Sequence, residues 1–140
     1  HTTKIKSMCR KPFPQIPIIK TGYKTAEMVK YFINNFLSVK VSFANEMYQI
    51  CNELNIDYDK VTEYALFDQR IGRSHLAVPG PDGDLGYGGH CFPKDIDAMI
   101  YLASSLSLDP IILESARSKN NSVRKNRDWE GMKGRAVSED

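Results

Sequence analysis

The chain has 140 residues, 41% of them apolar and 26% charged, a composition typical of a globular domain large enough for one hydrophobic core. Its formal net charge of +2 does not favour nucleic acid or an anionic membrane surface as a partner. No apolar run is long enough to span a bilayer, and the basic N-terminal stretch lacks the apolar core of a signal peptide, so no membrane association is expected.

The three cysteines, Cys9, Cys51 and Cys91, are odd in number and far apart in the sequence. They form neither a disulfide framework nor a CxxC metal pattern. His75 and His90 have no metal-ligand spacing relative to each other or to Cys91, so no metal site is expected. Because free cysteines are typical of a reducing compartment, we expect a cytoplasmic protein.

The first 20 residues are basic and rich in proline, and they end in the run Ile16-Pro17-Ile18-Ile19. This β-branched run predicts one short strand, and the prolines favour an edge position or a linker. The chain begins at His1 rather than methionine, and residues 131–140 are polar and aperiodic. Both ends are those expected of a segment cut from a longer protein.

A long helix is predicted from Ala26 to about Asn55, a stretch with neither glycine nor proline. Thr25 is a suitable N-cap, and Glu27 lies in the first turn, where the helix dipole favours a carboxylate. About 30 residues, each rising 1.5 Å, give a rod roughly 45 Å long. Apolar residues occupy more than one face of this rod, so it should be buried on most sides. Since the rest of the chain can hardly surround it, another subunit or further domains should cover part of it.

Three shorter helices are predicted after the long one. The segment 55–57 ends the long helix and caps a second helix over residues 58–67. Residues 68–90 form a loop dense in turn formers, and a loop of this length in a compact domain is usually functional or disordered. Prolines open a third helix over about 93–107 and a fourth over about 110–127. The expected fold is mainly α.

The segment Gly86-Tyr87-Gly88-Gly89-His90-Cys91-Phe92-Pro93-Lys94-Asp95 places a cysteine between a glycine-rich turn and a helix-opening proline. Glycines let backbone N–H groups approach a ligand closely, and the positive end of a helix dipole favours the reactive thiolate. The pattern predicts that Cys91 is an activated nucleophile beside a phosphate-sized cradle. The alternative is a flexible turn followed by a small buried apolar residue.

Two polar residues, Lys30 and Asn34, interrupt the apolar surface of the long helix. Their spacing of four places them on one face, where both could contact one ligand. Asp95 lies one helical turn after Cys91 and could orient or deprotonate a water near the sulfur. The alternatives are a snorkelling lysine beside an exposed asparagine, and an ordinary acidic residue in a first helical turn.

Arg70 could bind an anionic ligand in a bidentate manner, or it could form a surface ion pair with Asp68 or Glu63. The glycine-rich turn at residues 86–89 is not a dinucleotide-binding fingerprint. It follows no clear strand, lacks the full Gly-x-Gly-x-x-Gly spacing, and has no acidic residue about 20 positions later at the end of a second strand. The chain itself therefore contains no visible dinucleotide-binding unit.

Three blocks of the sequence carry a resemblance to a known family. They are Ala26–Asn35, Asp68–Gly72 and Gly88–Asp95, the last of which reads Gly-Gly-His-Cys-Phe-Pro-Lys-Asp. In content, order and separation they resemble the UDP-glucose/GDP-mannose dehydrogenase family of nucleotide-sugar dehydrogenases. The resemblance covers roughly residues 16–127.

The resemblance implies a parent protein with an N-terminal NAD-binding Rossmann domain, a central helical domain and a C-terminal UDP-binding domain. Residues 1–21 correspond to the tail of the first domain with a remnant of its last strand, 22–127 to the central dimerisation and catalytic-cysteine domain, and 128–140 to a linker. The central domain is expected to have three shorter helices packed on one long helix, similar to the C-terminal domain of 6-phosphogluconate dehydrogenase. A homodimer through the helix 26–55 is implied, and the chain alone is expected to be inactive.

The implied chemistry is an NAD-dependent oxidation of the sugar C6 alcohol to a carboxylic acid in two steps. Cys91 corresponds to the nucleophile that captures the bound aldehyde as a thiohemiacetal, which is then oxidised to a thioester. Lys30 corresponds to the lysine that stabilises negative charge on the substrate oxygen. Asn34 corresponds to an asparagine that helps to hold this oxygen or the water, and Asp95 to the carboxylate that positions the water.

The resemblance also assigns binding roles. Arg70 corresponds to an arginine that reaches the substrate of the neighbouring subunit, the turn 86–89 lines the sugar and phosphate side of the pocket, and Lys94 is a candidate cofactor contact. The block Asp68–Gly72 favours UDP-glucose, with GDP-mannose or a UDP-N-acetyl sugar as the alternative substrate. A helical dimerisation protein without chemistry is the alternative of a different class.

Overall fold

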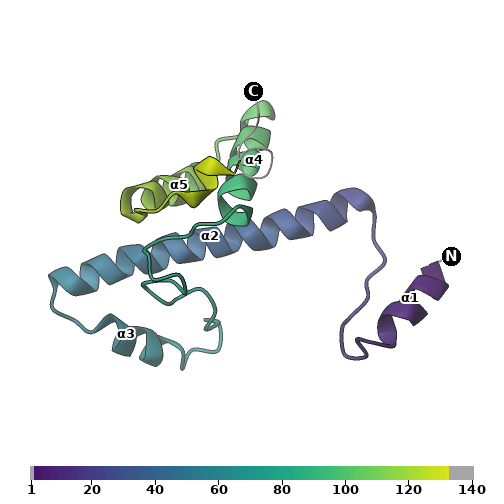
Figure 1. Cartoon of the computed structure of the whole chain (residues 1–140), viewed down its shortest axis with the longest axis horizontal. Helices are drawn as coiled ribbons and strands as arrows, with labels where there is room; N and C mark the ends of the chain where they lie inside the picture. Colours follow the sequence, from purple (N-terminus) through teal and green to yellow (C-terminus); the bar gives the residue numbers. More distant parts are fainter. Residues whose placement is uncertain (1, 133–140) are drawn as a thin grey trace.

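The computed structural model describes residues 2–132, and in this part of the chain it contains helices and no strand (Figure 1). The elements are α1 (Thr2–Arg10), α2 (Tyr23–Glu53), α3 (Tyr58–Ala65), α4 (Cys91–Ser105), α5 (Ile111–Val123) and the short 3-10 helix η1 (Asp128–Gly131). The shorter helices α3, α4 and α5 all contact α2. The expectation of a mainly α fold with three shorter helices on one long helix is confirmed.

The strand predicted at Ile16–Ile19 is wrong. Residues 17–22 run as an irregular segment between α1 and α2, and α1 occupies part of the basic N-terminal stretch. A single extended segment leaves its backbone donors and acceptors unpaired unless a neighbouring strand satisfies them. No strand lies in residues 2–132 to do so, and Pro17 lacks a donor of its own.

The long helix α2 has 31 residues, which gives a rod of about 46 Å, and it begins three residues before the predicted start. Gly22 is its N-cap and no side chain bonds there, so the predicted cap at Thr25 lies inside the helix. At the other end Asn55 adopts a left-handed backbone conformation with φ of 55°. The Asp57 side chain then accepts hydrogen bonds from the backbone N–H groups of Asp59 and Lys60, which caps α3 as predicted.

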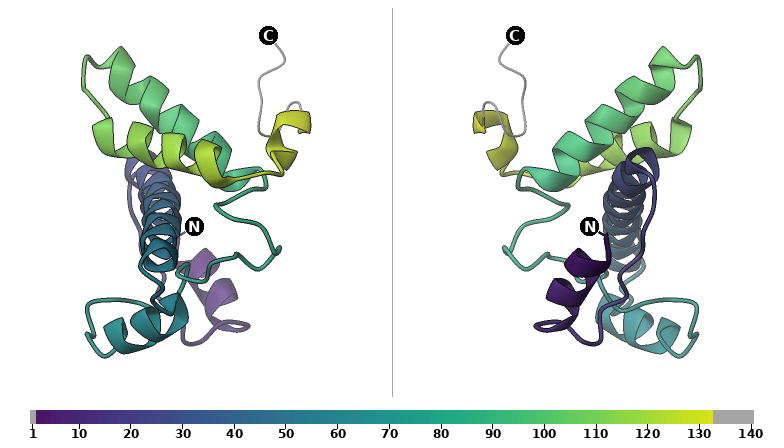
Figure 2. Two further views of the ribbon diagram at one scale, coloured as in Figure 1. Left: turned by 90° about the vertical axis from the view of Figure 1, so that its left-hand side faces the viewer. Right: turned by 90° about the vertical axis from the view of Figure 1, so that its right-hand side faces the viewer.

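The helices α4 and α5 lie on one side of α2, and α3 lies on the other (Figure 2). Two hydrophobic clusters hold these layers together. Ile96 and Ile100 of α4 meet Ala116 of α5 in the first cluster. The second cluster lies nearer α3 and contains Ala44, Cys51, Tyr58 and Val78.

Small and polar residues of α2 form much of the contact with α4 and α5. Ser38 and Ser42 are buried, and the Ser42 hydroxyl donates a 2.8 Å hydrogen bond to the Ala116 carbonyl of α5. Asn35 is also buried, and its side chain donates to the Asp95 carbonyl of α4 at 3.3 Å. Small side chains allow the helices to approach closely, while the amide fixes their relative position through directed bonds.

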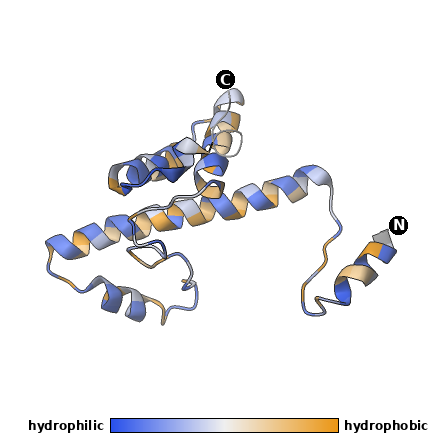
Figure 3. Ribbon diagram, viewed as in Figure 1, coloured by the Kyte–Doolittle hydropathy of each residue, from blue (hydrophilic) through white to orange (hydrophobic). Residues whose placement is uncertain are grey.

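Large apolar residues of α2 remain on the surface. Figure 3 shows apolar residues recurring along the whole helix. Val29, Phe36, Phe43 and Ile50 follow one another at intervals of seven residues and are between 45% and 60% exposed. An interval of seven keeps side chains on nearly the same face of a helix. The expectation that this chain alone leaves part of the rod uncovered agrees with these exposures.

Candidate active site

Three of the predicted site residues meet where α2 and α4 cross: Lys30 and Asn34 of α2, and Asp95 of α4. The Asn34 side-chain amide donates a 2.6 Å hydrogen bond to one carboxylate oxygen of Asp95. The ammonium of Lys30 lies 3.4 Å from the same oxygen. The ammonium of Lys94 bonds the other oxygen. Two positive charges and one amide donor therefore converge on a single carboxylate.

The electrostatics of the cluster keep Asp95 ionised. Its side chain is 0% exposed, and this burial alone raises the carboxyl pKa, but the hydrogen bonds from Lys94 and Asn34 and the charges of the two lysines outweigh burial and lower the pKa overall. The hydrogen bond to Asp95 likewise raises the pKa of Lys94. Since the side chain of Lys30 is 54% exposed, its ammonium still faces solvent on the side away from Asp95.

Cys91 is the first residue of α4 and is exposed, so the alternative of a buried apolar cysteine is wrong. The helix therefore begins two residues before the predicted proline start, and the sulfur lies within its first turn. The Sγ atom is 3.6 Å from Nε2 of His90. Lys94 lies one turn further along α4 and is bonded to Asp95.

The backbone of the glycine-rich turn is bonded to side chains of the chain itself. The N–H of Gly86 donates to Oδ1 of Asn45 at 3.0 Å, and the N–H of Tyr87 donates to Oδ1 of Asn120 at 2.7 Å. The N–H of Gly89 donates to the carboxylate of Asp128 at 3.0 and 3.2 Å. In this conformation these three amides hold the turn in place, and their N–H groups are not free to bind a phosphate.

The structure explains why glycine occupies two positions of this turn. A Cβ atom on Gly86 would collide with the Asn120 side chain, and the backbone there has a φ of +68°. A Cβ atom on Gly88 would collide with the guanidinium of Arg124 and would come within 2.7 Å of Asp128. Glycine at these two positions therefore leaves space for the side chains of Asn120 and Arg124, and at Gly86 it also allows the positive φ.

Four residues that position the turn were not identified from the sequence: Asn45, Asn120, Arg124 and Asp128. Two of them follow the C-terminal part of α5, and Arg124 has a side chain only 2% exposed. A sequence offers no direct signal for them, because asparagine, arginine and aspartate in helices and loops are ordinarily surface residues. The one available signal is Trp129, a large aromatic residue in the segment predicted to be a linker. Its side chain is buried, so this region packs on the domain.

Arg70 lies apart from this cluster in its own surroundings. Its guanidinium forms a bidentate pair with Asp68, with a shortest distance of 2.6 Å, and its side chain is 89% exposed. This hydrogen bond lowers the pKa of Asp68. The pair is the one that the surface alternative expected, and no contact within residues 2–132 brings Arg70 to Cys91 or Asp95.

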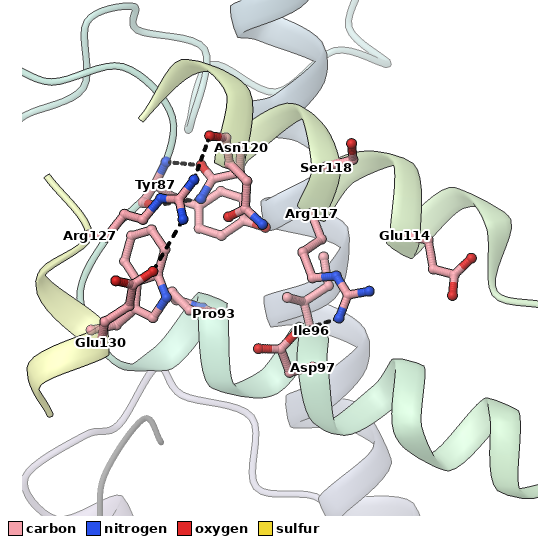
Figure 4. Close-up of a pocket in the computed structure, with 12 residues that line it drawn as sticks. Tyr87, Pro93, Ile96, Asp97, Glu114, Arg117, Ser118, Asn120, Arg127 and Glu130 are labelled. Carbon is pink, nitrogen blue, oxygen red and sulfur yellow. Dashed lines mark hydrogen bonds and ion pairs between the residues drawn. The ribbon is translucent and has the colours of Figure 1, made fainter. Parts of the chain in front are cut away.

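A polar cavity of about 470 Å³ lies on a different face of α4, between that helix, α5 and η1 (Figure 4). Asp97 and Arg117 form an ion pair of 3.0 Å along it, and Arg127 and Glu130 form another of 3.3 Å. Tyr87 lines the cavity, its buried hydroxyl has no hydrogen-bond partner, and burial raises its pKa. None of Lys30, Asn34, Cys91 and Asp95 lines it.

Within the described residues, no group of three or more histidine, cysteine, aspartate or glutamate side chains is arranged to hold a metal ion. Over the same residues, none of the helices combines the length and the apolar character needed to cross a membrane.

The sequence model of the UDP-glucose/GDP-mannose dehydrogenase family, central domain, matches residues 24–122. A UDP-glucose 6-dehydrogenase of Bacillus subtilis, YwqF, is 40% identical over 111 residues, which are 79% of this chain and 24% of that protein. AglM, a UDP-glucose 6-dehydrogenase of the archaeon Haloferax volcanii, is 40% identical over 105 residues, 75% of this chain and 23% of that protein. The chain thus spans about a quarter of the length of these relatives.

A solved structure has a similar fold. The UDP-glucose dehydrogenase of the hyperthermophilic archaeon Pyrobaculum islandicum superposes with a TM-score of 0.70 at 34% identity. The similarity covers 86% of this chain and 27% of that one.

Proposed function

The chain belongs to the UDP-glucose/GDP-mannose dehydrogenase family as its central domain, and we propose that it is the catalytic-cysteine domain of an NAD-dependent UDP-glucose 6-dehydrogenase. The overall reaction is the conversion of UDP-glucose, two NAD and water to UDP-glucuronate and two NADH. The observation that carries the proposal is an exposed thiol at the start of α4, one turn before a buried carboxylate that two lysines and an asparagine surround. The relatives named UDP-glucose 6-dehydrogenases support the choice of substrate.

In the proposed mechanism Cys91 attacks the C6 aldehyde that the first oxidation leaves in the site. The S–C bond forms, the carbonyl π bond breaks, and the oxygen takes up a proton to give a thiohemiacetal. The second oxidation leaves a thioester on Cys91, and water breaks its C–S bond to release the acid and restore the thiol. The covalent link keeps the reactive carbon in the site between the two oxidations.

The α2–α4 cluster stabilises charge and positions water in this scheme. The exposed side of the Lys30 ammonium faces the developing negative charge on the substrate oxygen, and Asn34 orients the same oxygen or the attacking water. Asp95 is ionised, 0% exposed and bonded at both oxygens, so it positions the water that approaches the thioester indirectly, by holding Lys30, Lys94 and Asn34 in place. Arg70 from a partner subunit binds the phosphate side, and the turn 86–89 borders the sugar without donating its bonded amides of Gly86, Tyr87 and Gly89.

NAD accepts the hydride in each oxidation, and we propose that a domain outside this chain binds most of it. Lys94 is the candidate contact from this chain. Its side chain is 35% exposed, and an ammonium has three N–H donors, so it can bond Asp95 and an oxygen of the cofactor together.

The three cysteines are free in the structure, which supports a reducing, cytoplasmic location.

The test is turnover by the full-length parent protein. We expect NADH release with UDP-glucose and NAD, and a loss of at least about 100-fold in kcat for Cys91→Ser, because serine is a far weaker nucleophile without a neighbouring base. Cys9→Ser is the matched control, since Cys9 is also exposed and free. Full activity of Cys91→Ser would overturn the mechanism. Turnover of GDP-mannose or a UDP-N-acetyl sugar in place of UDP-glucose would assign the alternative substrate, and no turnover of any nucleotide sugar would favour the non-catalytic dimerisation protein.

We further propose that the protein is a homodimer through α2. The face formed by Val29, Phe36, Phe43 and Ile50 leaves large side chains exposed along the helix. Beside Phe43, residues of α2 and α5 line an apolar hollow of about 240 Å³ to which Ile111 contributes. An apolar surface of this extent is unusual on a monomer and typical of a subunit interface.

Sedimentation of the chain tests the dimer. We expect the wild type to sediment as a dimer and Phe36→Glu combined with Phe43→Glu to sediment as a monomer, because a carboxylate at an apolar interface loses its hydration. Phe67→Glu is the control, since Phe67 is an exposed aromatic residue outside this face. A wild-type chain that stays monomeric at high concentration would contradict the proposal.

A further inference from the structure

The guanidinium of Arg124, the residue that follows α5, is a buried junction between three segments of the chain. It donates 2.7 Å hydrogen bonds to the carboxylate of Asp82 and to the carbonyl of Asn126, and it lies 3.5 Å from the carboxylate of Asp84. Its hydrogen bond to Asp82 lowers the pKa of that carboxyl. The Arg124 side chain is 2% exposed, whereas that of Asp82 is 50% exposed, so water reaches this contact only from the carboxylate side.

The junction continues to the residues that precede the thiol. The carboxylate of Asp128 is 3.9 Å from Arg124 and accepts the N–H of Gly89, two residues before Cys91. Arg124 also fills the space beside Gly88 that a Cβ atom would need. The carboxylate of Asp128 thus accepts a hydrogen bond from the backbone that leads into α4, and the buried guanidinium of Arg124 lies near it.

The loop needs such contacts, because residues 66–90 contain no helix or strand and have no regular hydrogen-bond pattern of their own. Asn45 and Asn120 fix the turn at Gly86 and Tyr87, and Asp128 fixes it at Gly89. Of the three anchored amides, that of Gly89, which is bonded to Asp128, is nearest in the sequence to Cys91. Both Arg124 and Asp128 lie beyond residue 122, where the match to the family's central domain ends.

We propose that Asp128, held in place by Arg124, is a positioning residue for the Cys91 thiol and acts through the Gly89 amide. The segment after α5 then does more than link two domains, since it sets where the first turn of α4 begins and so where the sulfur lies. The catalytic consequence depends on the function proposed above, whereas the effect on the thiol does not. Displacing a reacting group by about 1 Å costs on the order of 100-fold in rate, so a small shift of this backbone is sufficient to matter.

The test compares Asp128→Ala, Asp128→Asn and a control, Asp82→Ala. The control removes an acceptor of Arg124 but leaves the bond to Gly89, and the asparagine keeps an oxygen that can accept that bond. The first measurement is the rate at which iodoacetamide alkylates Cys91, resolved by mass spectrometry with Cys9 of the same molecule as reference. The second is hydrogen exchange at the Gly89 amide.

We expect Asp128→Ala to speed exchange at Gly89 at least tenfold and to slow alkylation of Cys91 roughly threefold, because the sulfur leaves the field at the start of α4. Asp128→Asn should recover most of both effects, and Asp82→Ala should change neither by more than about twofold. In the full-length protein, kcat of Asp128→Ala should fall about tenfold with KM changed less. Should Asp128→Ala fail to fold, Asp128→Ser takes its place with the same expected changes, because the serine side chain is one bond shorter and offers no carboxylate to the Gly89 amide.

Unchanged exchange at Gly89 and unchanged alkylation in a folded Asp128→Ala or Asp128→Ser variant would overturn the inference. So would an equal change in Asp82→Ala, which would show that general loosening of the network is responsible. These results are independent of turnover. An active Cys91→Ser enzyme would overturn the proposed function while leaving the alkylation and exchange results to decide the role of Asp128.

Discussion

Replacement of Asp95 by asparagine tests the charge cluster between α2 and α4 most directly. The substitution keeps the size and planarity of the side chain but removes its charge and one acceptor. In the wild type the two carboxylate oxygens accept from Asn34 at 2.6 Å and from Lys94, and Lys30 lies 3.4 Å away. An asparagine presents an NH₂ group to one of these donors, and two donors then face each other in a site with no exposure at Asp95.

The expected loss of unfolding free energy can be estimated from these contacts. An unmatched buried donor costs about 1–3 kcal/mol. Loss of the ion pair between Asp95 and each lysine adds at most about 1 kcal/mol. Lys30 and Lys94 are 54% and 35% exposed, so their ammonium groups can recover hydration when the carboxylate charge is removed. We therefore expect Asp95→Asn to lose about 2–4 kcal/mol.

The assay is urea denaturation of the 140-residue chain, followed by helical circular dichroism and by the fluorescence of Trp129, its single tryptophan. Asp97→Asn is the matched control, since Asp97 lies two residues further along α4 and forms an ion pair with Arg117 in which both side chains are about half exposed. A pair of this kind contributes at most about 1 kcal/mol. Equal losses in the two variants would refute the reasoning.

The pH dependence gives the same reasoning a second test. The folded protein lowers the pKa of Asp95 below its ordinary value of 3.8, so the ionised carboxylate stabilises the fold at pH values above the ordinary one. This contribution is lost as pH falls from about 4 through the lower pKa of the folded state. Wild-type stability should decline in this acid range more steeply than that of Asp95→Asn, and parallel declines would contradict the assignment.

Four further substitutions test the steric, backbone, capping and hydrogen-bonding effects in the glycine-rich turn and at the start of α3. Gly88→Ala should lower the free energy of unfolding by about 2–3 kcal/mol, since the new Cβ meets the buried Arg124 guanidinium. Gly89→Ala should lower it by only about 1–2 kcal/mol, the cost of its backbone φ of +70°, because a Cβ there meets nothing within 4 Å. Thermal denaturation of the two variants measures the difference, and equal losses would contradict the steric cause. Asp57→Ala should lower the free energy of unfolding by about 1 kcal/mol, because it removes the N-cap of α3. Unchanged hydrogen exchange at the amides of residues 59 and 60 would show that Asp57 does not cap the helix. Tyr87→Phe should raise stability by about 1 kcal/mol, because it removes a buried hydroxyl without a partner, and a lower midpoint would show that this hydroxyl is bonded in solution.

Helices α2 to α5 and their order were predictable from the sequence because their signals are local, whereas α1 and η1 were not predicted. A stretch of 30 residues without glycine or proline can hardly fold otherwise than as α2, and Asp57 begins α3 by bonding donors two and three residues away. The segment Ile16–Ile19 was assigned wrongly for the opposite reason, since a strand depends on a partner that the local sequence does not contain. The precise ends of the helices also differed, as at Gly22, because several neighbouring residues can cap equally well.

Spacing made Lys30, Asn34, Cys91 and Asp95 candidates, and the resemblance to the family selected them as a set. That the two helix faces carrying them meet, with Asn34 and Asn35 bonded to Asp95, depends on how α4 packs across α2. The crossing is a property of the packed layers and has no counterpart in either helix alone.

The residues that hold the glycine-rich turn were decided by tertiary structure alone. Arg124 and Asp128 have surface-like identities, and only the folded chain brings a guanidinium beside Gly88 and a carboxylate to the Gly89 amide. Short-range patterns determine helices, caps and the chemistry that a side chain can perform. Burial and long-range contacts determine which of those side chains meet, because that choice depends on the free energy of packing the whole domain.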